Sequence, residues 1–125
     1  MHTNPLITGT RVVLAVRDLQ KSVAHYRDKL GMESLWAGEG WHFLKRGTFV
    51  VMLGECTDEM PATAIGDHSY VAYIEVVHID ELYREFQSRE IELLSEPEDK
   101  PWGQREFGIR TPDGHRFMFG EEISD

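Results

Sequence analysis

The fold is decided by residues 14–32, which read LAVRDLQKSVAHYRDKLGM. They continue a β-branched, apolar run that starts at residue 11, and such a run is typical of a buried strand. Asp18 follows at the place where a helix N-cap belongs. Apolar residues then recur at the spacing of one helical face: Leu19, Val23, Tyr26 and Leu30. Gly31, a residue type that commonly ends helices, comes next. The stretch predicts a strand followed directly by a helix.

Short extended stretches follow this helix, and the same order of elements then begins again. Three strands are predicted after the first helix, at 32–37, 41–46 and 48–53. The second half is predicted to contain a strand at 70–76, a helix at 78–89, and strands at 91–94, 105–110 and 115–120. The turn sequence Thr-Pro-Asp-Gly at 111–114 separates the last two strands. The chain therefore reads strand–helix–strand–strand–strand twice.

The two halves keep a regular offset, although few of their letters match. Placing residues 16–19 over 76–79 gives an offset of about 60 positions, and placing Gly47 over Gly114 gives about 67. A longer loop at 96–104 absorbs the difference. We therefore predict one α+β domain over residues 1–125.

The predicted domain consists of two βαβββ modules at about 8–54 and 68–122, joined by a linker at 55–67. One helix can cover only one face of each sheet, so the other face is expected to stay open. Two such cup-shaped mixed sheets would form a cleft, and small ligands bind in clefts.

Composition and charge limit the partners. The formal net charge is −9, from 22 acidic and 13 basic residues, whereas nucleic-acid-binding proteins carry a basic footprint. The single cysteine, Cys56, excludes an internal disulfide framework and fits a reducing compartment. No apolar run approaches the roughly 20 residues of a membrane span, and the N-terminus lacks the pattern of a signal peptide. We expect a cytoplasmic protein that binds neither nucleic acid nor membrane.

The chain resembles a known superfamily. Residues 14–32 look like the first strand and helix of vicinal-oxygen-chelate proteins, which include glyoxalase I, extradiol dioxygenases and bleomycin-resistance proteins. IDELYREF at 79–86 and PWGQREFGIRTPDGHRFMFGEE at 101–122 are similar to the C-terminal half of bleomycin-resistance proteins in particular. The resemblance covers residues 11–122. It implies a homodimer with two clefts at the subunit boundary, in which residues 5–10 could serve as the arm that exchanges the first strand.

The resemblance also locates the metal-ligand positions. Metal-dependent members carry His or Glu on the first and last strands of each half. By register these positions are Arg11 and Val71 on the first strands, Met118 on the last strand, and Val51 or Met52 in the first half. None of these is a usual ligand here, and the six histidines show neither HxH nor HExxH spacing. We expect no metal and no other cofactor.

Catalytic signatures are missing from the sequence. Without a metal, neither the glyoxalase isomerisation nor oxygenase ring cleavage has its electrophile. The chain carries no GxSxG elbow, and nothing in the sequence marks Cys56 as activated. The residues therefore favour a binding protein over an enzyme, and no catalytic residue is predicted.

Aromatic residues give the stronger signal for a ligand site, because indole rings stack on heteroaromatic groups and cations. In the resistance proteins a tryptophan-bearing loop borders the drug groove, which by resemblance points to Trp102. Met52 and Met118 are expected to line the cup floor, Glu55 to meet a cationic ligand, and Arg105 either to face the ligand or to fix the loop. The full set of predicted ligand-binding residues is Trp102, Trp41, Trp36, Phe43, Met52, Glu55, Tyr73, Arg105, Phe107 and Met118.

The leading hypothesis is sequestration of a bleomycin-like glycopeptide, or of another planar cationic compound, by a homodimer without a metal. One alternative is a metalloenzyme of the glyoxalase or dioxygenase type with displaced ligands. Another is a binding protein for a native metabolite, whose sequence features would be the same.

Overall fold

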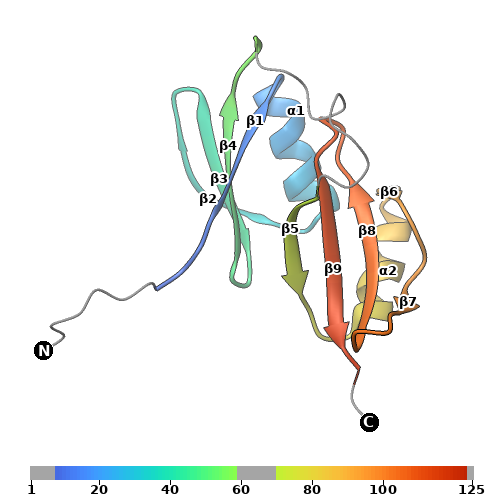
Figure 1. Cartoon of the computed structure of the whole chain (residues 1–125). Coiled ribbons are helices and arrows are strands. Elements are labelled where there is room, and N and C mark those ends of the chain that lie inside the picture. Colours follow the sequence, from blue (N-terminus) through green and yellow to red (C-terminus); the bar gives the residue numbers. More distant parts are fainter. Residues whose placement is uncertain (1–7, 59–69, 124–125) are drawn as a thin grey trace, which may run out of the picture.

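The computed structural model describes residues 8–58 and 70–123. Its elements form two βαβββ modules that stand side by side (Figure 1). The first module comprises β1 (Val12–Val16), α1 (Leu19–Ala24), the π-helical turn η1 (His25–Lys29), β2 (Glu33–Gly38), β3 (Trp41–Arg46) and β4 (Phe49–Glu55). The second comprises β5 (Tyr70–Glu75), α2 (Ile79–Ser88), β6 (Glu92–Leu93), β7 (Glu98–Asp99), β8 (Gln104–Arg110) and β9 (Arg116–Glu122), of which the two-residue strand β7 is additional to the βαβββ pattern.

Both sheets are mixed and have equivalent topology. The first has the strand order β1-β4-β3-β2 and the second β5-β9-β8-β6, with β7 also paired to β8. In each sheet the first strand lies parallel to the last, and the other neighbours are antiparallel. The predicted α+β class with two βαβββ modules is confirmed.

The pairing register shows the internal repeat in detail. Val13 on β1 lies opposite Met52 on β4, and Tyr73 on β5 lies opposite Met118 on β9. The residue after next in each last strand is a glycine, and a glutamate follows that glycine. From Val12 and Ala72 onward the two halves therefore correspond residue by residue along their paired first and last strands, whereas the start of β5 has a register shift between Tyr70 and Ala72.

The two glutamates, Glu55 and Glu121, perform the same task in each module. Glu55 Oε2 accepts a hydrogen bond from the Leu19 N–H at the start of α1 (3.0 Å). Glu121 accepts from the Ile79 N–H (3.0 Å) and the His78 N–H (2.9 Å) at the start of α2, and these bonds lower the pKa of its carboxyl. A carboxylate at a helix N-terminus satisfies orphan N–H groups and complements the helix dipole.

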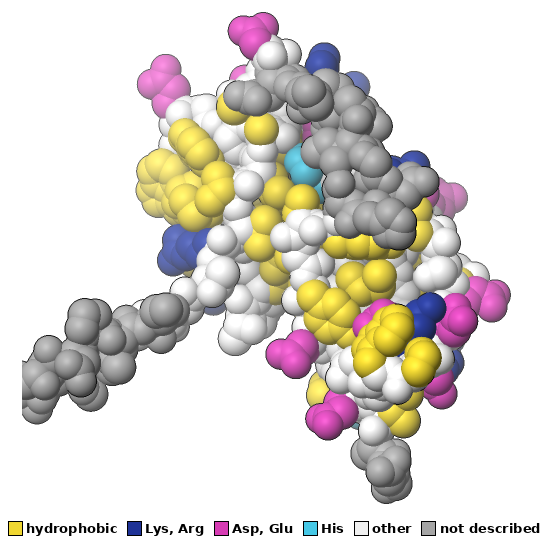
Figure 2. Space-filling view, viewed as in Figure 1, with side chains coloured by type: hydrophobic (Ala, Val, Ile, Leu, Met, Phe, Trp, Pro, Cys, Tyr) yellow, Lys and Arg dark blue, Asp and Glu magenta, His cyan; other side chains and the backbone are white. Residues whose placement is uncertain are grey.

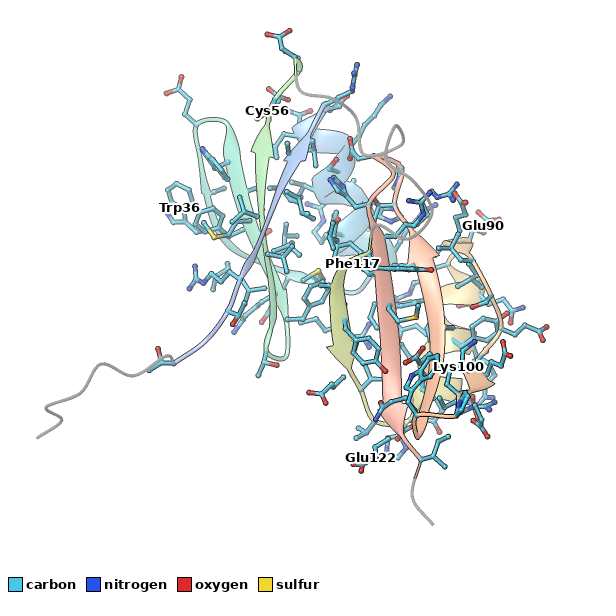
Figure 3. The ribbon with its side chains drawn as sticks, in the orientation of Figure 1. Trp36, Cys56, Glu90, Lys100, Phe117 and Glu122 are labelled. Atoms are coloured by element: carbon cyan, nitrogen blue, oxygen red, sulfur yellow. The ribbon has the colours of Figure 1, made fainter. Side chains whose placement is uncertain are left out.

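One core joins the modules. Tyr26 on η1 packs edge-on against Phe117 on β9, with ring centroids 6.3 Å apart, and Phe49 on β4 contacts the same ring at 5.5 Å. Figure 3 shows Phe117 at this junction, between the two halves. The buried apolar residues come from both modules: Leu14, Val16, Val23, Tyr26, Leu30, Met32, Leu44, Val51, Leu53, Ile79, Phe86, Ile91, Phe107, Ile109, Phe117 and Phe119.

A polar cluster lies where α1 meets the turn between β8 and β9. Asp113 accepts hydrogen bonds from the Arg17 N–H (3.2 Å) and the Ser22 hydroxyl. The nearby side chains of His25 and His115 are buried. Burial lowers the pKa of His25 to about 4 and also lowers the pKa of His115, so both rings are neutral at neutral pH.

The structure departs from the predicted elements in a few places. The predicted first helix changes from α-helical to π-helical geometry at His25, and its sequence period does not reveal this. The expected loop at 96–104 contains the short strand β7, which pairs with β8. Glu55, expected to open the linker, belongs to β4, and linker residues from 59 onward lie outside the described residues.

Within the described residues, no helix has both the length and the apolar character needed to cross a bilayer.

Candidate functional site

Each sheet buries one face under its helix and exposes the other. In β4, Val51 and Leu53 are completely buried, while Met52 between them points to the opposite face, next to the exposed Val13 of β1. We call the uncovered side of the β1-β4-β3-β2 sheet the first open face and that of the β5-β9-β8 sheet the second open face. Figure 2 shows hydrophobic side chains gathered over β2 and β3 and again over the lower part of the second sheet.

The first open face carries a cluster of three aromatic rings. Trp36 on β2 lies 4.9 Å from Phe43 on β3, and Trp41 on β3 meets the same phenylalanine edge-on at 6.2 Å, measured between ring centroids. Trp36 remains 52% exposed and projects away from the helices in Figure 3. These residues, with Met52 and Val13, offer an exposed surface of flat rings of the kind that stacks on planar ligands.

Two glycines leave the space that the indole rings of Trp36 and Trp41 occupy. A Cβ at Gly54 on β4 would lie 2.9 Å from the ring of Trp41, and a Cβ at Gly38 would collide with the ring of Trp36. Because glycine lacks this atom, each ring can lie across the strand backbone. The aromatic surface of the first open face therefore depends on glycine at both positions.

The second open face is built around Glu106 on β8. Tyr73 on β5 extends across Gly120 on β9, where a Cβ would overlap its phenol, and its hydroxyl donates to Glu106 Oε2 at 2.8 Å. The indole Nε1–H of Trp102 donates to the same oxygen at 2.9 Å. Glu106 is 6% exposed, whereas Trp102 is 64% exposed. The buried carboxylate thus accepts hydrogen bonds from the exposed indole of Trp102 and from the phenol of Tyr73.

Burial raises the pKa of Tyr73 to about 12, and the hydrogen bond and negative charge of Glu106 act in the same direction. The phenol therefore remains protonated across the neutral range and continues to donate to Glu106. Its oxygen also lies 3.2 Å from the side-chain oxygen of Gln104.

The structure places most of the predicted ligand-binding residues on these two faces. Trp36, Trp41, Phe43 and Met52 lie on the first; Tyr73, Trp102 and Met118 lie on or beside the second. Trp36, for which a place in the core was the alternative, is exposed on the first open face.

Three predicted residues lie on the helix side instead, because side chains alternate along a strand. Phe107 is 1% exposed and stacks on Phe119 with centroids 5.5 Å apart. Arg105 pairs with Asp80 and Asp99, each at 2.9 Å, so it fixes the loop before β8 to the start of α2. Both carboxylates keep its pKa above the usual value. Glu55, the third, caps α1 as described above.

Glu106 is a residue of the candidate site that the sequence prediction missed. A signal for it was present: in QREFGIR at 104–110, Phe107 and Ile109 alternate with Glu106 and Gly108. Period-two alternation places the two apolar residues in the core and the glutamate on the opposite face. The sequence could not reveal that Tyr73 and Trp102 converge on its carboxylate.

The metal-ligand positions of the superfamily do not fit a metal in this chain. Met52, rather than the buried Val51, lies on the open face, and Met118 takes the equivalent position in the second sheet. Arg11 and Val71 are both exposed. A guanidinium, an alkyl group and two thioethers are poor ligands for Zn²⁺, Ni²⁺ or Fe²⁺. Within residues 8–58 and 70–123, no three His, Cys, Asp or Glu side chains come together to bind an ion.

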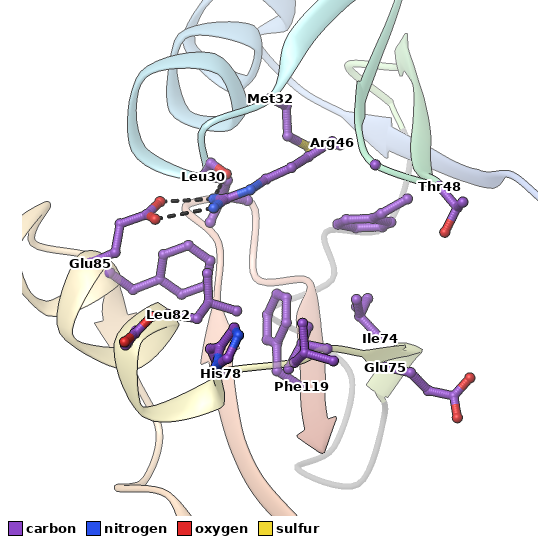
Figure 4. A pocket seen from close by; sticks show the side chains of 16 residues that line it. Leu30, Met32, Arg46, Thr48, Ile74, Glu75, His78, Leu82, Glu85 and Phe119 are labelled. Carbon is purple, nitrogen blue, oxygen red and sulfur yellow. Dashed lines mark hydrogen bonds and ion pairs between the residues drawn. The ribbon is translucent and has the colours of Figure 1, made fainter. Parts of the chain in front are cut away.

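A separate pocket of about 500 Å³ lies between the modules (Figure 4). Its walls include Leu30, Met32, Ile74, Leu82 and Phe119, and none of the predicted ligand-binding residues lines it. At one side Arg46 donates to Glu85 with both terminal nitrogens, at 2.8 and 3.1 Å, and to the Leu30 carbonyl at 3.0 Å. Because Arg46 and Glu85 are paired with each other, they connect the two modules and are not free to bind a ligand. We therefore assign the candidate site to the open faces.

Comparison with known proteins is consistent with this architecture. Residues 10–119 match the family model described as the glyoxalase/bleomycin resistance protein/dioxygenase superfamily. The chain is 29% identical over 123 residues to the bleomycin resistance proteins of Geobacillus stearothermophilus and Staphylococcus aureus, with 88% of this chain and 93% of theirs covered.

Solved structures show the same fold. A glyoxalase/bleomycin resistance protein/dioxygenase from Nocardioides has a TM-score of 0.73 at 26% identity and covers 98% of this chain and 87% of its own. The bleomycin resistance determinant encoded on transposon Tn5 has a TM-score of 0.76 at 22% identity, with 93% and 98% covered.

Proposed function

Because the chain belongs to the glyoxalase/bleomycin resistance protein/dioxygenase superfamily, we propose that it is a metal-independent binding protein that sequesters a planar, cationic small molecule. The observation that carries this proposal is the chemistry of the open faces. They hold the chain's three tryptophans, all exposed, and they hold methionines where a metal-binding relative needs ligands. Such faces can bind by stacking but cannot polarise a substrate through an ion.

The charge of the protein supports a cationic ligand. The net charge of −9 attracts cations and repels polyanions over the whole surface. Exposed indole faces bind cations through the ring quadrupole as well as by apolar contact. A glycopeptide of the bleomycin type, with flat heteroaromatic rings and a cationic tail, satisfies both requirements, and the similarity to bleomycin resistance proteins supports this choice of ligand.

We further propose that the open faces are completed in a homodimer. Each face is one-sided, whereas pockets that hold drug-sized ligands enclose most of the ligand surface. A second copy could place its second open face against the first open face of its partner and so form two equivalent clefts. Sedimentation velocity at micromolar concentration should give twice the chain mass of 14.4 kDa; a stable monomer would contradict the dimer.

Titration with metal-free bleomycin in excess chelator tests the proposed ligand. Since all three tryptophans lie on the open faces, the intrinsic fluorescence should be quenched and should saturate. The absence of a saturable change up to roughly tens of micromolar ligand, a weak affinity for a sequestering protein, would exclude bleomycin. Elemental analysis of the purified protein addresses the metalloenzyme alternative, because stoichiometric Ni, Zn or Fe coupled to turnover of a hemithioacetal or a catechol would favour it.

A further inference from the structure

Glu106 is a buried acid at the centre of an aromatic surface. Its side chain is only 6% exposed. The rings of Tyr73 and Trp102 flank it on the second open face. Burying a carboxylate is costly unless its oxygens find hydrogen-bond donors or a countercharge. Apolar packing therefore cannot account for a glutamate at position 106, and its hydrogen bonds have to be considered.

Among the residues that the structure describes, the hydrogen-bond donors to Glu106 reach only one of its oxygens. Both the phenol of Tyr73 and the indole N–H of Trp102 bind Oε2. Oε1 has no hydrogen-bond partner within the described part of the chain. An ionised carboxylate can accept about four hydrogen bonds, so the group keeps the capacity to bind at least one further donor.

No lysine, arginine or histidine in the described part of the chain forms an ion pair with the carboxylate of Glu106. Arg105, its chain neighbour, points to the opposite side of the sheet and is occupied by Asp80 and Asp99. Glu75, on the same strand as Tyr73, acts on the phenol as a second negative charge. A cationic donor arriving from solvent would therefore meet a negative potential at Glu106.

We propose that Glu106 is the specificity-determining residue of the second open face, where its carboxylate accepts a hydrogen bond from a protonated amine or amidine of a flat ligand stacked on Trp102. This inference rests on the proposed binding function and narrows it to ligands with an N–H cation next to the stacked ring. Neutral planar molecules would use the same stacking surface with lower affinity. A charge-assisted hydrogen bond is the stronger kind because one partner is ionised.

The contribution of Glu106 can be separated from stacking with a pair of fluorescent tricycles. At mildly alkaline pH, 9-aminoacridine is a cation and acridine is neutral, while their ring systems match. Wild-type protein should bind 9-aminoacridine about ten- to hundredfold more tightly than acridine, the range for a hydrogen bond to a charged group. In Glu106→Gln the amide oxygen can still accept from Trp102 and Tyr73, so acridine binding should be retained while the preference for the cation disappears.

Glu92→Gln is the matched control, because it removes the same charge from an exposed residue that pairs with Arg110 at the sheet edge. It should keep the preference for the cation. Equal binding of both tricycles by wild type, or equal loss of both in Glu106→Gln, would overturn the role of Glu106 while leaving the binding function in place. Failure of wild type to bind either tricycle would instead contradict the proposed stacking function, and the inference with it. Near-ultraviolet circular dichroism establishes that each variant is folded.

Discussion

Replacement of Phe107 by alanine is expected to lower the free energy of unfolding by about 3–5 kcal/mol, the usual cost of removing a buried phenylalanine. Its ring is surrounded by other aromatic rings: it stacks on Phe119 and meets Tyr83 and Phe86 edge-on, at centroid distances of 5.5, 5.3 and 6.1 Å. Alanine would leave a cavity between the second sheet and α2. Urea unfolding followed by circular dichroism measures the loss.

Phe43→Ala is the matched control for this prediction. The same substitution on the first open face removes a ring that packs only on one side, against Trp36 and Trp41. Its cost should be about 1 kcal/mol, within the common range for single substitutions. If the two variants lost equal stability, the assignment of Phe107 to the core and of Phe43 to an open face would be wrong.

Trp102→Ala is expected to weaken binding of metal-free bleomycin by about 1–3 kcal/mol, which is roughly 5- to 150-fold in the dissociation constant. The indole is mostly exposed and its N–H is fixed by Glu106, so the ring is already oriented for stacking in the free protein. Calorimetric titration of both proteins gives the difference directly. The variant should also lose some stability, because alanine removes one of the two hydrogen-bond donors to the buried carboxylate of Glu106.

Trp102→Phe provides the control for ring stacking. It keeps an aromatic ring but loses the donor to Glu106, so its affinity should lie between those of wild type and Trp102→Ala. An affinity unchanged in Trp102→Ala would remove this residue from the ligand site.

The fold could be read from the sequence because its local signals agree. Asp18 marks the first helix, and Gly31 ends the helical segment with a φ of +71°, the left-handed conformation that glycine adopts without strain. The repeat was detectable because the same order of strands and helix recurs at a nearly constant offset. Similarity to a family with known architecture then fixed how two such modules combine.

The candidate site was only partly predictable. Residue type indicates the exposed tryptophans correctly, but period-two spacing places Phe107 on the same side of its strand as the buried Ile109, and Glu55 on the same side as the buried Leu53. Residue type alone therefore does not locate a side chain, because its position depends on which face of the strand it occupies. The role of Glu106 depends on Tyr73 crossing Gly120 from another strand, which is a tertiary contact without a local sequence signal.

The pocket between the modules was not predictable at all, because its walls come from the segment after η1 and from β3, β4, β5, α2 and β9. It is large enough for a small molecule, so it is the natural competitor of the open faces. The methionines distinguish the two: Met52 and Met118 lie on the open faces, whereas Met32 lines the pocket.

Methyl-resolved NMR of protein labelled at the methionine methyl groups tests the central claim most directly. On addition of metal-free bleomycin in chelator, the signals of Met52 and Met118 should shift and saturate together, while Met32 stays in place. Assignments follow from single Met→Leu substitutions. A shift confined to Met32, or one that appears only after a divalent metal is added, would contradict metal-free binding at the open faces.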